Sequence, residues 1–145
     1  METKQVIMMR TDLNMRKGKM IAQGAHASMK VLLDRLEWRG QKTEHPREHD
    51  PEFSETVTFQ EVRAFVEEAM LEWIKGRFTK IGLRVESEQE LVDLYTKAKE
   101  AGIPCSLIED QGLTEFHGQI TKTCCAIGPA EVADIDRITG HLKPL

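Results

Sequence analysis

Four cationic side chains lie within ten residues of one another near the start of the chain. They are Arg10, Arg16, Lys17 and Lys19, in the stretch RTDLNMRKGK. A helix is expected directly after them, and the unpaired N–H groups and dipole of a helix N-terminus favour an anion. A short charge run is usually a solvated turn, but a purely structural turn would sooner place acids at a helix start. The pattern therefore favours an anion site.

A second polar segment, DQGLTEFHGQIT (residues 110–121), follows another predicted strand. It also contains glycine, which lets a backbone approach a ligand closely. Ligands of open α/β sheets bind beyond the C-terminal ends of the strands. If the two strands are near neighbours, Lys19 and Asp110 should face each other across one cleft. The alternative for Asp110 is a structural role, capping the turn that follows.

Several common catalytic patterns do not occur in the sequence. We find no G-x-x-x-x-G-K-[ST] phosphate loop, no G-x-G-x-x-G and no G-x-S-x-G elbow, which argues against nucleotide hydrolysis, dinucleotide binding and a serine nucleophile. The three cysteines, Cys105, Cys124 and Cys125, lack C-x-x-C spacing. We expect them to be reduced core residues and expect no zinc site. His26 is expected to be an ordinary helix histidine.

Alternating strand and helix patterns supply the elements that must position these groups. Strands are predicted over 4–10, 77–85, 104–109 and 122–128. Four helices are predicted. The first covers residues 19–38, and the last runs from Pro129 to Gly140. Two others begin at capping boxes, one from the T-x-x-E at Thr58 to Gly76 and one from Ser87 to Gly102. In the first helix we expect small residues to permit close packing and the Met and Leu stripe to be core.

This order predicts an α/β fold in a single layered domain, residues 1–145, with a four-stranded, mostly parallel sheet and helices on both faces. The twelve-residue link before the last strand has no helical pattern, so one antiparallel pair is expected there. Residues 40–55 are charged and carry two prolines, and we interpret about 40–58 as an acidic surface insertion.

Composition narrows the class of protein. The chain has 145 residues, 40% hydrophobic and 30% charged, with a net charge of −4. No eighteen-residue apolar window and no apolar N-terminal segment occur, so we expect a cytoplasmic protein without a membrane span. Residues 1–40 carry eight basic against four acidic side chains, whereas residues 41–72 carry three against nine. A basic region on an acidic protein can bind a polyanion locally.

Three separated motifs resemble the second, archaeal and eukaryotic, class of peptidyl-tRNA hydrolases. They are VIMMRTDLNMRKGKMIAQGAHAS, CSLIEDQGLTEF and the C-terminal TCCAIGP with ITGHLKPL. The similarity covers nearly the whole chain except about residues 37–75. It implies an α/β fold with a four-stranded mixed sheet, often as a homodimer. It further implies hydrolysis of the ester between a peptide, or N-blocked aminoacyl group, and the tRNA 3′ end, with no metal or organic cofactor.

The resemblance also assigns residues. The basic-loop lysines of that family fall on Lys17 and Lys19, its helix glutamine on Gln23 and its strand-end aspartate on Asp110. Its following threonine falls on Thr114. The threonine before the last strand falls on Thr123, although the loop looks one residue longer than is common, so Thr121 competes for this role. Arg16 stands where a glycine is common and makes the loop more basic.

Ester hydrolysis needs a positioned water and a stabilised oxyanion. On the resemblance, Asp110 would orient or activate the water, and Lys19 with the helix-start N–H groups would hold the oxyanion or the terminal phosphate. Thr123 or Thr121 would hold water or the 3′ end. Arg10, Arg16 and Lys17 would contact phosphates, with Gln23 and Thr114 also at the substrate.

Two other functions stay open at this point. The same fold could be a non-catalytic tRNA- or RNA-end-binding module, or a protein-interaction domain that uses residues 40–72. The combination of Lys17, Lys19, Asp110 and Thr123 favours the enzyme.

Overall fold

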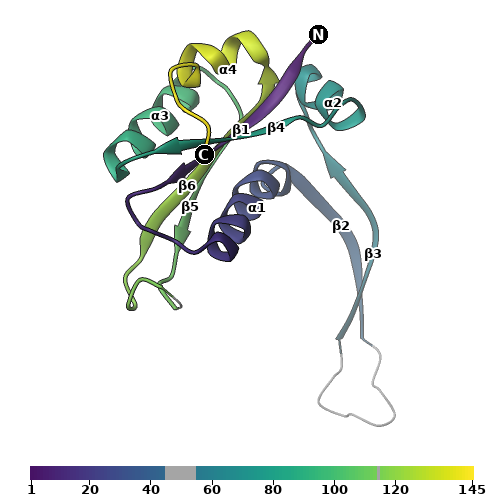
Figure 1. Ribbon diagram of the computed structural model, residues 1–145. Coiled ribbons are helices and arrows are strands. Elements are labelled where there is room, and N and C mark those ends of the chain that lie inside the picture. Colours follow the sequence, from purple (N-terminus) through teal and green to yellow (C-terminus); the bar gives the residue numbers. More distant parts are fainter. Residues whose placement is uncertain (45–54, 114) are drawn as a thin grey trace.

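The computed structural model describes residues 1–44, 55–113 and 115–145, with only the backbone of 39–44 and 55–60 (Figure 1). In chain order the elements are β1 (Thr3–Arg10), α1 (Lys17–Leu33), β2 (Leu36–Glu44), β3 (Glu55–Ala64), α2 (Glu68–Lys75), β4 (Lys80–Val85), α3 (Glu88–Glu100), β5 (Cys105–Asp110), β6 (Thr121–Glu131) and α4 (Val132–Thr139).

The central sheet has four strands in the order β4-β1-β6-β5. The β1–β4 pair is parallel, whereas β1–β6 and β5–β6 are antiparallel. A mixed four-stranded sheet with an antiparallel β5–β6 pair is therefore confirmed, but the expectation that it is mostly parallel is wrong. The reason is that the chain returns from β5 to β6 without a helical crossover and then pairs along β1.

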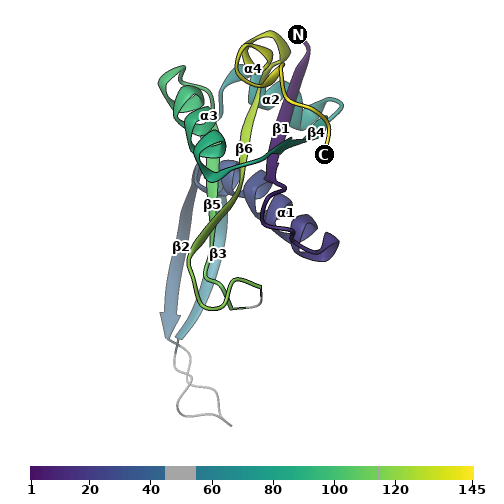
Figure 2. The same cartoon turned by 60° about the vertical axis from the view of Figure 1, so that its left-hand side comes forward.

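Helices cover both faces of this sheet, as expected (Figure 2). Because side chains alternate along a strand, Val6 and Met8 of β1 pack with α3 and α4, while Met9 packs with α1 and α2. The Ser87 hydroxyl accepts the Glu90 N–H and caps α3, which confirms the second capping box.

The face that α1 turns toward the sheet is small and polar. Its buried residues are Gln23, Gly24, Ala27, Ser28 and Val31. Two hydroxyl groups hydrogen-bond α1 to the sheet: that of Ser28 donates to Gln5 of β1, and that of Ser106 in β5 donates to the Ala27 carbonyl. The prediction that small residues permit close packing is therefore confirmed for Gly24 and Ala27, whereas Ala25 is exposed.

The expected Met and Leu core stripe of α1 is confirmed only in part, because Met20 and Leu32 pack against the core. Ile21, Met29 and Leu33 are exposed. Backbone packing through the small residues turns these three side chains away from the sheet.

The region before α2 differs most from expectation. Residues 36–44 and 55–64 form an antiparallel hairpin that projects from the body, and α2 begins at Glu68 rather than after Thr58 (Figure 1). The run TVTF is rich in β-branched and aromatic residues, which favour a paired strand over a helix. Residues 45–54 of the acidic insertion lie outside the described residues.

Pro129 does not begin a helix. It lies within β6 after a cis Gly128–Pro129 peptide, at an irregularity in the pairing with β1, and α4 begins at Val132. A pairing irregularity tolerates the missing N–H of proline as well as a helix start does.

Candidate functional site

Lys19 and Asp110 meet at one end of the sheet. Asp110 is the last residue of β5, and Lys19 lies in the first turn of α1. The distance from Lys19 Nζ to Asp110 Oδ1 is 2.6 Å, and the two side chains are only 13% and 12% exposed. The prediction that they share one cleft is confirmed, so the basic loop and the polar segment after β5 belong to one site.

Three further groups hold this ion pair. The Gly112 N–H donates to Asp110 Oδ2 over 2.9 Å, and Gln23 Nε2 donates to Oδ1 over 3.3 Å. The Lys19 ammonium lies 5.4 Å from the centre of the Phe116 ring, within cation–π range. The carboxylate therefore has a fixed position and orientation.

The hydrogen bond from Lys19 keeps the pKa of Asp110 below its ordinary value, although burial acts in the opposite direction. The Gly112 N–H and Gln23 contribute in the same sense as Lys19. Asp110 is thus an anion at neutral pH and a weak base. This environment favours orienting a water molecule over full removal of its proton.

Thr123 acts on the ion pair through Gln23. Its side chain is fully buried in β6, and its hydroxyl donates to Gln23 Oε1 over 2.5 Å. This bond sets the amide so that its nitrogen points to Asp110. The geometry supports an indirect, positioning role rather than a direct contact with water or the 3′ end.

Thr121 is also close to the site but is connected differently. It pairs with Asp110 across the β5–β6 ladder, while its hydroxyl donates to the Gln119 carbonyl of its own loop. Its role stays a prediction. Thr114 lies outside the described residues.

The basic loop splits into two parts. Arg10 is buried and engaged, because its guanidinium donates twice to the Asp12 carboxylate and once to the Lys122 carbonyl. Its expected phosphate contact is therefore not supported by this geometry. Arg16 and Lys17 are exposed.

The start of α1 has features that favour an anion. Arg16 is its N-cap residue with no side-chain cap, and the first turn contains no acid. The first N–H bonded within the helix belongs to Met20, so the N–H groups of residues 17 and 18 have no helical acceptor. The Arg16 N–H donates to Glu115 Oε2 over 3.4 Å, so a carboxylate from the loop after β5 already lies at this helix start.

A cavity of about 340 Å³ adjoins the ion pair. Its walls are Lys19, Gln23, His26, Ile108, Glu109, Asp110, Gln111 and Leu113. His26, which we expected to be an ordinary helix histidine, lines this cavity. The signal was its spacing, since residues 19, 23 and 26 lie on one helix face.

Two comparisons place this geometry among known proteins. The family model "Peptidyl-tRNA hydrolase PTH2" matches residues 3–145. The chain is 39% identical to the peptidyl-tRNA hydrolase of Methanocaldococcus jannaschii, over 98% of this chain and 99% of the relative. It is 37% identical to that of Sulfurisphaera tokodaii over the full length of both, and 36% identical to that of Halobacterium salinarum over 97% of each. The chain belongs to this family.

The resemblance to peptidyl-tRNA hydrolases found in the sequence is thereby confirmed. The matched span includes every residue assigned to the site. Within the described parts of this family member, no three His, Cys, Asp or Glu side chains are grouped as metal ligands, and no helix is long and apolar enough to cross a membrane.

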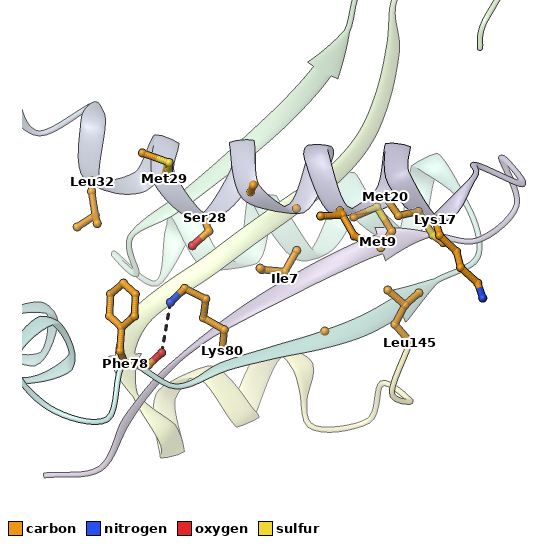
Figure 3. A pocket seen from close by; sticks show the side chains of 14 residues that line it. Ile7, Met9, Lys17, Met20, Ser28, Met29, Leu32, Phe78, Lys80 and Leu145 are labelled. Atoms are coloured by element: carbon orange, nitrogen blue, oxygen red, sulfur yellow. Dashed lines mark hydrogen bonds between the residues drawn. The ribbon is translucent and has the colours of Figure 1, made fainter. Parts of the chain in front are cut away.

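A larger cavity in this peptidyl-tRNA hydrolase family member lies elsewhere, on the flank of α1 that faces β1 and β4. It measures about 870 Å³ and is almost wholly apolar (Figure 3). Its lining includes Ile7, Met9 and Met29, with Lys80 bonded to the Phe78 carbonyl at one end. Its lining includes neither Lys19 nor Asp110, although Lys17 borders it at one end.

Proposed function

We propose that the chain hydrolyses the ester that joins a peptide, or an N-blocked aminoacyl group, to the 3′ end of tRNA. The observation that carries the proposal is the Lys19–Asp110 pair at the N-terminus of α1, in a chain of the peptidyl-tRNA hydrolase family. The relatives at 34–39% identity bear the same name.

The reaction adds water across the ester. We assign Asp110 to hold the attacking water by accepting a hydrogen bond, which its ionised state allows. The water oxygen bonds to the carbonyl carbon, and the bond from that carbon to the ribose oxygen then breaks. One water proton ends on the ribose oxygen, which leaves a peptide acid and a free tRNA hydroxyl.

Lys19 and the N–H groups at the start of α1 supply positive charge where negative charge develops. An ammonium has three N–H donors, so the bond to Asp110 is compatible with a contact to the substrate carbonyl oxygen or the terminal phosphate. We place Arg16 and Lys17 on tRNA phosphates, because both are exposed beside this end of the helix.

A hydrolysis assay with purified protein and N-acetyl-aminoacyl-tRNA tests the proposal. Lys19→Ala and Asp110→Asn should each lower turnover at least about 100-fold, the usual range for one electrostatic or acid–base group. Asp134→Asn on the far face of the sheet, and Lys97→Ala on α3, are exposed matched controls that should keep full turnover.

Folded wild-type protein that binds tRNA without product would refute the enzyme and support the non-catalytic binding module. Full turnover in Lys19→Ala or Asp110→Asn would refute the assigned site.

We also propose that the α1–β4 groove, the 870 Å³ cavity of Figure 3, is the contact of a homodimer. Ile21 is 74%, Met29 57% and Leu145 55% exposed along it. Large apolar side chains gathered on one face are typical of a protein interface, and a second copy would cover them. Sedimentation should show a dimer that Ile21→Glu converts to a monomer, while Phe65→Glu, equally exposed but outside the lining of the groove, does not.

Three further predictions stay with this proposal. They are a single domain over residues 1–145 with an acidic insertion at about 40–58, a protein-binding surface within residues 40–72, and a cytoplasmic location. The buried, unpaired thiols of Cys124 and Cys125 support a reducing compartment.

A further inference from the structure

Strand β5 is an edge strand whose outer side faces a channel. The Gly128 N–H donates to the Pro104 carbonyl, and this bond shows which residues of β5 are hydrogen-bonded to β6. By alternation, Ser106 and Ile108 turn their backbone groups to β6, while Cys105 and Leu107 turn theirs outward. Among the described residues, no other segment forms backbone hydrogen bonds with this outer edge.

Two adjoining cavities form this channel. The first is the 340 Å³ cavity at Lys19 and Asp110. The second, of about 540 Å³, is lined by His26, Lys30, Tyr95, Leu107, Ile108 and Glu109. They share His26, Ile108 and Glu109, so the space continues from the reaction site along β5, between α1 on one side and α3 on the other. We call this space the β5 channel.

We propose that the β5 channel binds the peptide part of the substrate in an extended conformation, as an added strand that runs parallel to β5. This inference rests on the proposed function and deepens it. The channel joins the candidate active site directly, and an exposed strand edge offers N–H and C=O groups that pair with any peptide backbone.

The direction of the peptide follows from the chemistry. The ester is at the C-terminal end of the peptide, and it must lie at Asp110, the C-terminal end of β5. The rest of the peptide then extends toward Cys105, in the same direction as β5. At about 3.3 Å per residue, the outward N–H and C=O of Leu107 come level with the second to fourth residues from the ester.

The distribution of charge favours the peptide in the β5 channel and the RNA at the start of α1. Beyond the ion pair, the described lining of the channel has one cation, Lys30, and one anion, Glu109. Because these charges offset each other, the channel attracts a polyanion only weakly. The exposed Arg16 and Lys17 lie at the start of α1, beyond the reaction site, and attract phosphates there. The acceptor end of tRNA in the β5 channel is therefore the less favoured arrangement.

Backbone pairing would also make binding independent of peptide sequence. Main-chain hydrogen bonds supply the affinity, while side chains along a strand alternate outward. A hydrolase that meets peptides of every sequence needs this kind of recognition.

The test measures kcat/KM of the wild-type protein on one tRNA that carries an N-acetylated aminoacyl, dipeptidyl, tripeptidyl or tetrapeptidyl group. We expect kcat/KM to rise about tenfold by the tripeptide, which corresponds to one or two backbone hydrogen bonds, and then to level off. N-methylation of single peptide amides should remove most of that gain at one position and leave it intact at the next, because only alternate amides face β5.

A protein variant gives an independent measurement. Leu107→Pro removes an outward N–H at an edge position, where proline is tolerated, and should bring the ratio of tripeptidyl to aminoacyl kcat/KM close to one. Leu107→Ala keeps the N–H and should keep the ratio. Circular dichroism checks that both variants are folded.

Each outcome decides the matter. Equal kcat/KM for all lengths, or a length gain without alternation under N-methylation, overturns the inference and leaves the proposed function intact. Protection of the channel residues by a CCA trinucleotide, with no N-methyl effect, assigns the channel to the RNA and also overturns it. No hydrolysis of any substrate refutes the proposed function itself, and the inference with it.

Discussion

Replacing Thr123 by valine removes one hydroxyl beneath the candidate site without changing the shape of the side chain. The hydroxyl donates to Gln23 Oε1 over 2.5 Å, and Gln23 is only 4% exposed. In the variant this amide oxygen loses its donor inside the protein. The amide can also turn over, which would bring its oxygen against the Asp110 carboxylate in place of the nitrogen now 3.3 Å away.

The magnitude follows from these contacts. A buried acceptor left without a donor costs about 1–3 kcal/mol, so the free energy of unfolding should fall by that amount. If about 1.4 kcal/mol of the loss is expressed in the transition state, kcat falls about tenfold. KM should change little, because Thr123 is fully buried and does not reach the substrate.

The assay combines urea unfolding with hydrolysis of N-acetyl-aminoacyl-tRNA by three variants. Thr123→Ser keeps the hydroxyl and loses a buried methyl group, so it should lose about 1 kcal/mol of stability but keep its turnover. Thr121→Val tests the competing threonine. A folded Thr123→Val with wild-type kcat, or a Thr121→Val with the larger loss of turnover, would refute the reasoning.

Four further predictions concern the same site. Because Lys19 lowers the pKa of Asp110, the step that depends on this carboxylate should stay level from pH 8 to 5 and decline only below about 3.9; a midpoint above pH 5 in a kcat profile would contradict this. The ionised Asp110 carboxylate stabilises the folded protein at pH values above its pKa in the unfolded chain. This stabilisation is lost as the pH falls through the lower pKa that Asp110 has in the folded protein, so Asp110→Asn should destabilise more at pH 7 than at pH 3 in urea titrations. Gly112→Ala should lower both melting temperature and kcat, since Gly112 has φ +78° and a Cβ would lie 2.5 Å from the Gln119 carbonyl oxygen; an unchanged kcat would show that the Gly112 N–H does not matter to Asp110. Changing Arg16 and Lys17 to Gln should each reduce the salt dependence of tRNA binding, measured as log Kd against log salt, by roughly 0.7–0.9; an unchanged slope would remove them from the RNA contact.

The local sequence pattern predicted most of the helices and strands but not how all of the strands pair. The apolar runs around Met8 and Cys124 became strands, and the box at Ser87 became the start of α3. The T-x-x-E pattern at Thr58 failed, because a four-residue motif carries less information than the strand partner available in residues 36–44. Strand direction failed for a similar reason, since pairing depends on which strands meet in space.

The same division holds at the site. The types and order of Lys19, Gln23 and Asp110 were visible in the sequence, because cations before a small-residue helix and an acid after a strand are local features. Their bonding was not. The bond from Arg10 to the Lys122 carbonyl, the hydroxyl of Thr123 beneath Gln23 and the place of His26 in the cavity depend on groups brought together from separate segments.

By itself, the sequence determined most elements of the α/β layers, the family resemblance and the candidate residues of the site. Only the tertiary structure decided which face of α1 meets the sheet, which threonine supports the carboxylate and which strand edge stays open. The physical reason is range: helix and strand preferences arise within a few residues, whereas burial and hydrogen-bond pairing join groups as far apart as Lys19 and Asp110, 91 residues along the chain.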